Sequence, residues 1–197
     1  MLAPVPTSVA IISAVVAGYL LGSVTVARRV ARRHGGADLR TVGDLNPGYW
    51  NAREQLGRRA ALPVFAVDTG KGTLAAGLGW LLADTGQWWL PYLAGGAAMV
   101  GHAWPLFAGF RGGRSVLTFV GAGLVFAPLP ASVAVGLFAL IWAGSRNFGW
   151  GARFGVAAFP VCQIIVEGPN RTALTGCLMT LIGLRFLQAQ SGDVPRA

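Results

Sequence analysis

The amino-terminal stretch Pro4–Ala27, PVPTSVAIISAVVAGYLLGSVTVA, decides the fold class because it is apolar over its whole length. A helix needs about 20 apolar residues to cross the hydrocarbon core of a bilayer. A cleaved signal peptide would carry its basic residues before the apolar run and would end at a small-residue cleavage site. Here the arginines follow the run, and the run is too long for a signal peptide. The stretch is therefore expected to be a retained membrane helix.

The remaining sequence has the same apolar character. Apolar residues make up 54% of the chain, charged residues only 12%, and the mean hydropathy is +0.56. A soluble domain usually carries about 25% charged residues. Glycines and prolines interrupt the further apolar runs, which we place at 60–83, 88–107, 114–129, 131–145, 152–167 and 172–190. The two short runs on either side of Pro128–Pro130 can form either a tight helical hairpin or one broken element.

These runs predict an all-α, polytopic membrane protein with roughly seven short transmembrane helices in a single domain over residues 1–197. Lys and Arg are retained on the cytoplasmic side of a membrane. Twelve arginines fall in the segments 28–59, 108–114 and 145–153, against only Arg171 in the alternate connections. The amino terminus is therefore expected outside and the carboxyl terminus in the cytoplasm. We expect a multi-pass protein of the inner (plasma) membrane whose polar clusters face the cytoplasm.

The net charge of +9 would also suit a nucleic-acid-binding protein. The basic residues lie between apolar runs, however, so anionic lipids and phosphorylated substrates at a cytoplasmic membrane face explain them better, and no nucleic acid is expected. Cys162 and Cys177 both fall inside apolar runs. We expect both to be small buried residues rather than a disulfide or a metal site, and no metal is expected because zinc-ligand spacing is missing.

The first polar cluster is Asp38–Asn51, with the sequence DLRTVGDLNPGYWN. Gly43 and the Pro47-Gly48 pair indicate a tight turn. The cluster offers a cation, an anion and two amides, at Arg40, Asp44, Asn46 and Asn51. Two interpretations remain open: a solvated loop closed by an Asn-Pro-Gly turn, or a loop that binds a substrate.

Asp68 and Lys71 lie inside the apolar run 60–83, in the sequence DTGKG. Residues at i and i+3 share one face of a helix, so the two charges can pair, which is how charge is tolerated within a membrane. Lys71 is the only lysine beside 15 arginines, and its compact ammonium differs from the planar arginine fork. We favour a functional role over a purely structural ion pair, because an ionisable pair in a span is a functional hypothesis by default.

A third cluster combines Gly101–Pro105 (GHAWP) with Arg111–Val116 (RGGRSV). Exposed backbone N–H groups at the start of the next helix would form an anion site, and two arginines would add charge. Simpler alternatives are a basic Gly-Gly turn at the membrane boundary and, for His102, a buried hydrogen-bonded histidine. A fourth group, Ser145–Asn147, contains Arg146 and is equally consistent with a topology anchor.

In this order, the clusters resemble the bacterial acyl-phosphate:glycerol-3-phosphate acyltransferase family. The segments that carry the resemblance are Gly18–Ser23 (GYLLGS), Gly43–Asn51 after Arg40, Asp68–Gly72, Gly101–Pro105, Arg111–Val116 and, more loosely, Arg146–Phe148. The likeness runs from about residue 18 to residue 160. Family members have seven helices with their motifs on the cytoplasmic side, which agrees with the topology expected from the charges.

The resemblance implies transfer of a fatty acyl group from acyl phosphate to the 1-hydroxyl of glycerol 3-phosphate, giving lysophosphatidic acid for phospholipid synthesis without any cofactor. It implies catalytic roles for Arg40, Lys71 and His102. The residues that it implies for substrate binding are Asp44, Asn46, Gly48, Asn51, Asp68, Arg111, Gly112, Gly113, Arg114 and Arg146. The partners expected are acyl phosphate, glycerol 3-phosphate and the lipid bilayer, and the protein is expected to be a monomer.

Several departures from the family pattern bear on activity. Asp44 replaces a serine, Ser115 replaces a glycine, and small residues become Leu45, Tyr49 and Trp50. The family's closing His-Arg-Glu-Asn-Ile-x-Arg-Leu motif has no counterpart in Leu184–Gly192. These departures keep open a second hypothesis, a non-catalytic paralogue that binds phosphorylated lipid or regulates a membrane partner. A third, a small transporter, is disfavoured because the charges cluster at one face.

Overall fold

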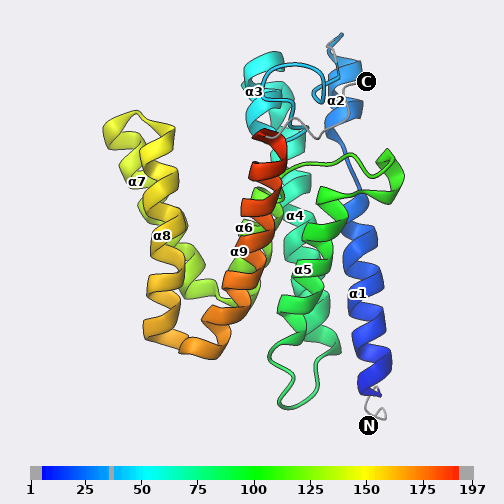
Figure 1. Cartoon of the computed structure of the whole chain (residues 1–197), viewed down its shortest axis with the longest axis vertical. Coiled ribbons are helices and arrows are strands. Elements are labelled where there is room, and N and C mark those ends of the chain that lie inside the picture. The colour runs from blue at the N-terminus through cyan, green and yellow to red at the C-terminus, as the bar shows by residue number, and fades with distance from the viewer. Residues whose placement is uncertain (1–5, 36–37, 191–197) are drawn as a thin grey trace.

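The computed structural model describes residues 6–35 and 38–190. Over these residues the chain is helical, with no strand, which confirms the all-α prediction (Figure 1). The helices are α1 (Thr7–Ser23), α2 (Ala27–Arg33), α3 (Tyr49–Leu56), α4 (Arg58–Leu82), α5 (Leu90–Ala103), η1 (Leu106–Ala108), α6 (Val116–Phe126), α7 (Pro128–Ser145), α8 (Phe148–Glu167) and α9 (Pro169–Gln190).

Each apolar run expected from the sequence corresponds to one helix. After α1, the runs at 60–83, 88–107 and 114–129 correspond to α4, α5 and α6, and the last three correspond to α7, α8 and α9. In the described part of the chain, four helical segments are long and apolar enough to cross a membrane: Thr7–Arg33, Pro128–Ser145, Phe148–Glu167 and Pro169–Ala189. The fold is therefore that of a helical protein with membrane-spanning segments.

The region around Pro128–Pro130 contains two separate helices. They meet at Ala127, whose backbone angles (φ −143°, ψ 66°) are not helical. Pro128 occupies the first position of α7, where its missing N–H group costs no hydrogen bond. The proline therefore begins a helix here instead of bending one.

The sequence predicts a loop over 28–59, and this is wrong in part, because α2 and α3 lie there. Ala27, Val30 and Ala31 recur at helical spacing, so α2 buries one apolar face while its four arginines stay exposed. This face packs with Leu39, Ala52 and the start of α4 in a small apolar core. Both short helices therefore sit over the end of α4 that leads to the candidate site.

Helices α1, α4, α5 and α6 pack closely because small residues line their crossings. At the α4–α6 crossing, Gly72 lies against the carbonyl of Thr118, and Gly121 lies against that of Thr69. A methyl group at either glycine would collide with the carbonyl that it faces. Across the same crossing, Thr73 Oγ1 donates to Gly121 O at 3.0 Å. Small residues let membrane helices approach to this distance, where backbone contact holds the pair together.

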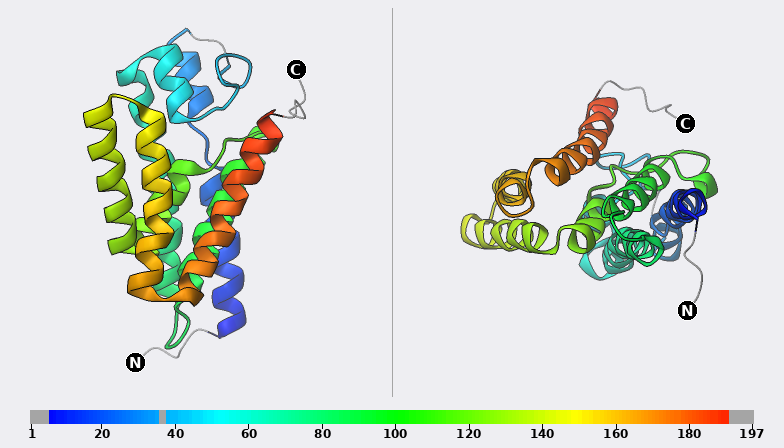
Figure 2. Two further views of the ribbon diagram at one scale, coloured as in Figure 1. Left: turned by 60° about the vertical axis from the view of Figure 1, so that its left-hand side comes forward. Right: turned by 90° about the horizontal axis from the view of Figure 1, so that it is seen from below.

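The α7 and α8 helices pair with each other beside this bundle, and α9 returns along it (Figure 2). Aromatic rings pack both within the bundle and between the bundle and α8. Phe159 of α8 meets Phe119 of α6 edge to face at 5.4 Å, and Tyr92 of α5 stacks on Phe126 of α6 at 4.1 Å. Such ring pairs prefer these offset and perpendicular geometries. The Phe159–Phe119 pair therefore links the α7–α8 pair to α6 of the bundle.

A polar group also joins α5 to α8 at the end of the molecule opposite α2 and α3. Gln163 Nε2 donates to Tyr92 Oη at 3.0 Å and to Glu167 Oε2 at 2.9 Å. The Arg171 guanidinium lies 5.2 Å from the centre of the Trp88 ring. Buried polar side chains of membrane helices need such partners, so this group ties the two helices together.

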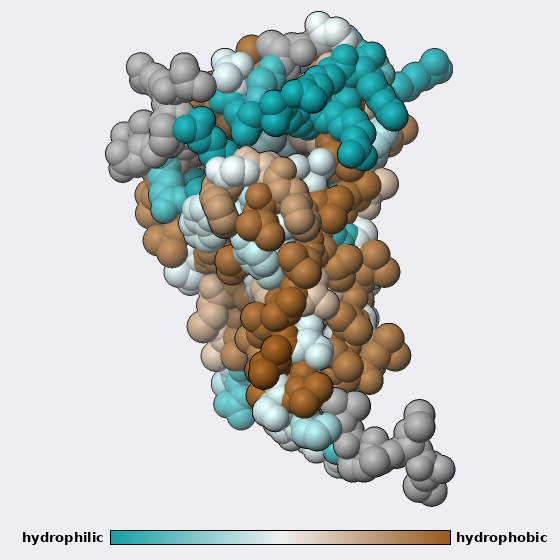
Figure 3. Space-filling view, turned by 90° about the vertical axis from the view of Figure 1, so that its right-hand side faces the viewer, coloured by the Kyte–Doolittle hydropathy of each residue, from teal (hydrophilic) through white to brown (hydrophobic). Residues whose placement is uncertain are grey.

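Hydrophilic side chains gather at the end of the molecule that carries α2 and α3, above a broad apolar surface (Figure 3). Large apolar side chains are exposed along the helices, among them Leu81 at 85%, Ile165 at 78% and Leu140 at 71%. An apolar surface of this extent is stable against lipid hydrocarbon but not against water. The arrangement agrees with a bilayer around the helices and a polar face at one end.

Both cysteines are free thiols. Cys162 is half-buried, but Cys177 is exposed on α9, so the prediction that it is buried is wrong. An apolar run in a membrane helix can face lipid as well as protein, and the sequence pattern does not distinguish the two.

Candidate functional site

Asp68, Lys71 and His102 form a buried charged cluster between α4 and α5. Lys71 Nζ lies 3.0 Å from Asp68 Oδ1, which confirms the pairing expected from their i, i+3 spacing. His102 Nδ1 lies 3.4 Å from the same oxygen but without hydrogen-bond geometry. None of the three side chains is more than 7% exposed. Charges buried this deeply are tolerated because they compensate one another.

The Lys71 ammonium also reaches α1. It donates to the carbonyl of Val24, the residue that caps the end of α1, at 3.3 Å. A lysine has three N–H donors, and within residues 6–35 and 38–190 two of them have partners. One donor therefore remains for an anion. A planar guanidinium would not place single N–H groups on these two oxygens in the same space.

Gly112 and Gly113 lie against the carboxyl end of α5. Gly112 N donates to Ala103 O at 3.2 Å, and Gly113 N donates to His102 O at 3.1 Å. These carbonyls belong to the last turn of α5, which has no helical partners of its own. The anion site expected from the sequence therefore cannot use these two amides, because both are already engaged.

The diglycine turn also brings the first and third sequence clusters together. A side-chain carbon on Gly113 would lie 3.1 Å from Asn46 Oδ1 and would collide with His102 Nε2. Gly48 is similarly close, since a side-chain carbon there would lie 2.8 Å from Asn46 Nδ2. Asn46, His102 and the diglycine turn thus surround one point. Glycine is required at these positions because a side chain would come too close to neighbouring atoms, not because the backbone angles demand it.

Sequence reasoning missed Arg185, which holds this turn from the side of α9. Its guanidinium donates from Nε to Gly113 O at 3.3 Å and from Nη2 to Gly112 O at 3.1 Å. It also lies 5.0 Å from the centre of the Trp104 ring. An arginine inside an apolar run, as Arg185 is in the run 172–190, is a usual sign of function in membranes, and that signal would have indicated it.

Ser115 occupies the position where the family pattern has glycine. Its φ of 63° is in the left-handed region that favours glycine. The Ser115 hydroxyl donates to Met99 O at 2.7 Å and ties the start of α6 to α5. This bond offsets part of the conformational cost of a side chain at that position.

The buried side chain of Asn51 binds the backbone of the 38–51 loop at several points. Its Nδ2 group donates to the carbonyls of Leu39, Val42 and Asn46 at 2.8, 2.9 and 3.2 Å. Asn51 is completely buried, and its Oδ1 has no hydrogen-bond partner in the described part of the chain. The side chain thus holds the loop closed, which is consistent with the turn that the sequence indicates.

Asp44 and Arg114 form an ion pair that joins the loop to the start of α6. Arg114 Nη1 donates to Asp44 Oδ2 at 2.7 Å, and Arg114 Nη2 donates to the carbonyl of Asp44 at 3.3 Å. The guanidinium lies 4.6 Å from the centre of the Phe186 ring of α9. Of Arg111 and Arg114, the two arginines of the Arg111–Val116 segment, Arg114 is thus the one that the fold brings to the 38–51 loop.

Arg40 pairs with Asp38 at the polar end of the molecule. Arg40 Nε donates to both oxygens of Asp38 at 3.0 Å. The hydrogen bond from Arg40 holds the pKa of the Asp38 carboxyl below its ordinary value, and the same bond raises the pKa of Arg40.

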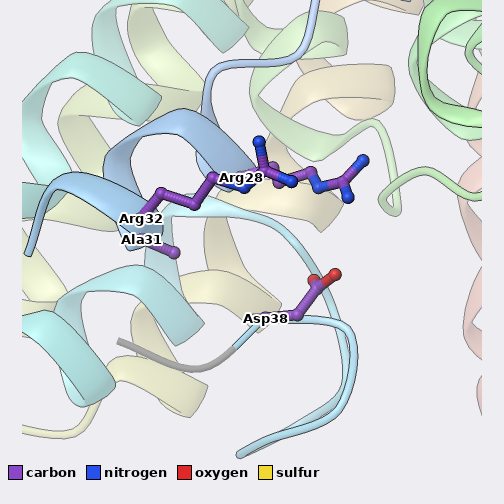
Figure 4. A pocket seen from close by; sticks show the side chains of 4 residues that line it. All are labelled: Arg28, Ala31, Arg32 and Asp38. Carbon is purple, nitrogen blue, oxygen red and sulfur yellow. The ribbon is translucent and has the colours of Figure 1, made fainter. Parts of the chain in front are cut away.

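Arg28 and Arg32 extend over a depression of about 200 Å³ that Asp38 also lines (Figure 4). Among the described residues, no hydrogen bond or ion pair joins the residues that line this depression to Asp68, Lys71 or His102.

Two predicted binding residues remain outside the cluster. Arg111 and Arg146 are exposed, and neither forms an ion pair with the described residues. The bulky residues that replace small ones in the first loop pack against other rings. Trp50 lies 4.3 Å from Phe148, and Tyr49 lies 5.4 Å from Phe65, between ring centres.

The opening motif of α1 positions the stretch after α5. Tyr19 Oη donates to Trp104 O at 3.0 Å, and Ser23 Oγ accepts from Leu106 N at 3.2 Å. Ser23 Oγ in turn donates to Tyr19 O at 2.9 Å. These bonds hold the chain as it leaves α5 and turns toward Gly112. The motif is therefore a support for the site, which explains why its polar residues lie on an otherwise apolar helix.

A buried Asp-Lys-His cluster lies beside a basic diglycine turn at the polar end of an apolar helical bundle, and these features together define an integral membrane protein with a charged group buried near one end. The family described as glycerol-3-phosphate acyltransferase matches residues 12–190, and the chain belongs to that family.

Curated relatives agree with this assignment. The glycerol-3-phosphate acyltransferase of Clostridioides difficile is 36% identical over 80% of this chain and 78% of its own length. That of Jannaschia sp. is 36% identical over 85% and 81%. The chain spans less of two Dehalococcoides mccartyi relatives, glycerol-3-phosphate acyltransferases 4 and 5, covering 64% and 61% of their lengths.

Two solved structures have the same fold. Both are of PlsY (YgiH), an integral membrane glycerol 3-phosphate acyltransferase. Its glycerol 3-phosphate form has a TM-score of 0.77 at 26% identity and covers 95% of each chain. Its lysophosphatidic acid form has a TM-score of 0.74 at 25% identity and covers 92% of each chain. The comparisons confirm the family resemblance and the membrane-embedded fold.

Proposed function

We propose that this protein transfers a fatty acyl group from acyl phosphate to the 1-hydroxyl of glycerol 3-phosphate, forming lysophosphatidic acid for phospholipid synthesis. The observation that carries the proposal is the buried Asp68–Lys71–His102 cluster beside the diglycine turn, in a chain of this family. The forms in which the solved relative is known, with glycerol 3-phosphate and with lysophosphatidic acid, correspond to the acceptor and the product of this reaction.

In this reaction the acceptor hydroxyl oxygen forms an ester bond with the acyl carbon, and the bond from that carbon to the phosphate oxygen breaks. Inorganic phosphate leaves with the electron pair, and the hydroxyl proton passes to a base. We assign that role to His102, because Nδ1 faces Asp68 while Nε2 faces Gly113. Lys71 would stabilise the charge on the leaving phosphate, and Arg40 would join it only by releasing Asp38, its partner in the structure. Holding two reactants in one site supplies much of the rate, since acyl phosphate is already activated.

The remaining candidate residues would bind the substrates around this centre. Asn46, Gly48 and the diglycine turn surround the point next to His102, and Arg114 adds a cation at its edge. Asp68 holds Lys71 in place, and Asn51 holds the loop. The exposed residues Arg111 and Arg146 would attract anionic substrates to the membrane surface.

We also propose that α1 and α4 to α9 cross the inner (plasma) membrane, with the amino terminus outside, the carboxyl terminus in the cytoplasm and the site facing the cytoplasm. The arginine-rich segments at one end support this orientation. A monomer with one domain and no cofactor would suffice, because the described site residues all come from a single chain.

The test is to assay the purified chain in detergent micelles with acyl phosphate and glycerol 3-phosphate. We expect lysophosphatidate and inorganic phosphate in equal amounts. The Lys71→Met variant should lose both products, whereas Arg59→Gln, at an exposed position outside the site, should retain them. A folded wild-type protein that forms neither product, while a known family member is active in parallel, would reject the proposal.

A further inference from the structure

Arg114 is the cation that α6 presents at the edge of the proposed site, and a carboxylate of the same chain already holds it. Asp44 Oδ2 lies 2.7 Å from Arg114 Nη1. The two side chains are 32% and 18% exposed, so the pair is only partly screened by water. The contact joins positions 70 residues apart, which shows that it arises from the tertiary fold and not from local sequence.

The pair is held in place on both sides. Asp44 Oδ1 accepts a hydrogen bond from Asn46 N at 3.2 Å, so the turn orients the carboxylate. On the other side, the Arg114 guanidinium lies over the Phe186 ring at 4.6 Å. Its Nε is buried without a hydrogen-bond partner in the described part of the chain. The guanidinium therefore has an unused donor while its terminal nitrogens contact Asp44.

The pair borders the point where a phosphate would lie. Gly113, next to Arg114 in sequence, separates His102 Nε2 from Asn46 Oδ1. Asn46 is itself two residues from Asp44 and receives its orientation from the same turn. A carboxylate and a phosphate use the same fork of guanidinium donors. An anionic substrate that uses Arg114 must consequently displace or share the Asp44 carboxylate.

We propose that Asp44 is a specificity-determining residue, an internal competitor that occupies the phosphate position on Arg114 when the site is empty. This rests on the proposed function and deepens it. A carboxylate carries one negative charge, whereas a phosphate monoester carries up to two near neutral pH. Asp44 therefore raises the affinity that an anion needs in order to displace it from Arg114. Phosphate esters meet that requirement, whereas monovalent anions such as free fatty acid carboxylates do not. The phosphate concerned belongs to either the acyl donor or the glycerol 3-phosphate acceptor.

The experiment compares wild type with Asp44→Asn in the full-length protein in detergent. Asparagine keeps the oxygen that accepts from Asn46 N but removes the charge. Calorimetric titration with inorganic phosphate and with glycerol 3-phosphate should show a Kd at least roughly tenfold lower in the variant, the factor expected when one competing charge-assisted contact is lost. Acetate should bind wild type poorly and the variant measurably. Glu54→Gln removes an exposed charge from α3 and should leave every Kd unchanged.

Kinetics then identify the source of the phosphate. The KM of the substrate that contacts Arg114 should fall in Asp44→Asn, with kcat within a factor of about two and the other KM unchanged. If Asp44→Asn does not fold, Asp44→Ser, which also offers an oxygen to Asn46, replaces it.

Equal or weaker phosphate binding in the folded variant would overturn the proposal, and a loss of kcat at constant KM would make Asp44 a catalytic group instead. Because binding is measured without turnover, an inactive wild type with tighter phosphate binding by Asp44→Asn would reject the acyltransferase function while leaving the competition intact.

Discussion

Lys71 shows how much at this site depends on the shape of one charged group. Its ammonium contacts Asp68 and the Val24 carbonyl at once. We expect Lys71→Arg to retain the charge but lose at least about 100-fold in turnover, because a planar guanidinium cannot replace the ammonium in a buried, nearly closed space. Initial rates of phosphate release measure the effect. The reverse exchange, Arg59→Lys at an exposed position, should leave the rate unchanged, and a fully active Lys71→Arg would show that only charge matters.

Asp38 gives a prediction about pH. Because Arg40 lowers the pKa of Asp38 in the folded protein, the pair stabilises the fold above the ordinary pKa of about 3.9. That stabilisation is lost as pH falls through the lowered value. We expect the pair to contribute about 1 kcal/mol, since both side chains are about a quarter exposed (25% and 29%). Thermal unfolding of Asp38→Asn should therefore differ from wild type at pH 6, and the difference should vanish as pH falls below the lowered pKa of Asp38. A constant difference over that range would contradict the assignment.

The contacts of single residues were predictable where the partner lies nearby in the sequence. The Asp68–Lys71 pair follows from an i, i+3 spacing, and the turn around Asn46 follows from Pro and Gly. The sequence could not place His102 against Asp68, because that contact depends on how α5 crosses α4. The sequence likewise could not show that Arg185 reaches the diglycine turn, since α9 returns to that turn only through the tertiary fold.

Among the elements, α9 has the most direct effect on the site. Arg185 binds two carbonyls of the diglycine turn, which lysine cannot do with the same fork. We expect Arg185→Lys to raise the KM of a phosphate substrate or lower kcat by about tenfold without changing the melting temperature by more than a few degrees. Arg171→Lys is a matched control on the same helix, because Arg171 also lies over a tryptophan ring but at the opposite end. Equal effects of both variants would indicate a merely structural role.

The α4–α6 crossing gives a second test at this scale. Gly72→Ala would push a methyl group into the Thr118 carbonyl, so we expect a loss of about 1–3 kcal/mol in stability. Gly70, two residues earlier in α4, has open space at the same position. Gly70→Ala should therefore be neutral or stabilising by up to about 1 kcal/mol. Thermal unfolding in detergent separates the two, and equal melting temperatures would contradict the close crossing.

Helices were predictable as elements because apolar runs of this length have few alternatives. The ends of the helices were less predictable, since α5 stops at Ala103 whereas the apolar run continues to residue 107. The short helices α2 and α3 were not expected, because a segment rich in arginine carries no long apolar pattern. Their apolar face becomes visible only once it packs on α4.

For the molecule as a whole, the arginine distribution predicts which end faces the cytoplasm. In a variant without Cys162 and Cys177, we expect Thr85→Cys in the α4–α5 connection to react with an impermeant maleimide in intact cells. Glu54→Cys in α3 should react only after the cells are opened, because α3 lies at the arginine-rich end. Both positions are exposed, so access and not burial decides the result. The opposite pattern would reverse the orientation.

The shortness of α5 has a consequence for how two unlike reactants meet. Its 14 residues extend about 21 Å, less than the roughly 30 Å of a hydrocarbon core. Measured from Trp88 and Trp89, which precede α5 and suit the outer interface, the helix ends before the inner headgroups. His102 would thus be recessed within one leaflet. A water-soluble acceptor would have to enter the leaflet to reach His102, while the long hydrocarbon tail of the donor would stay in the hydrocarbon core throughout.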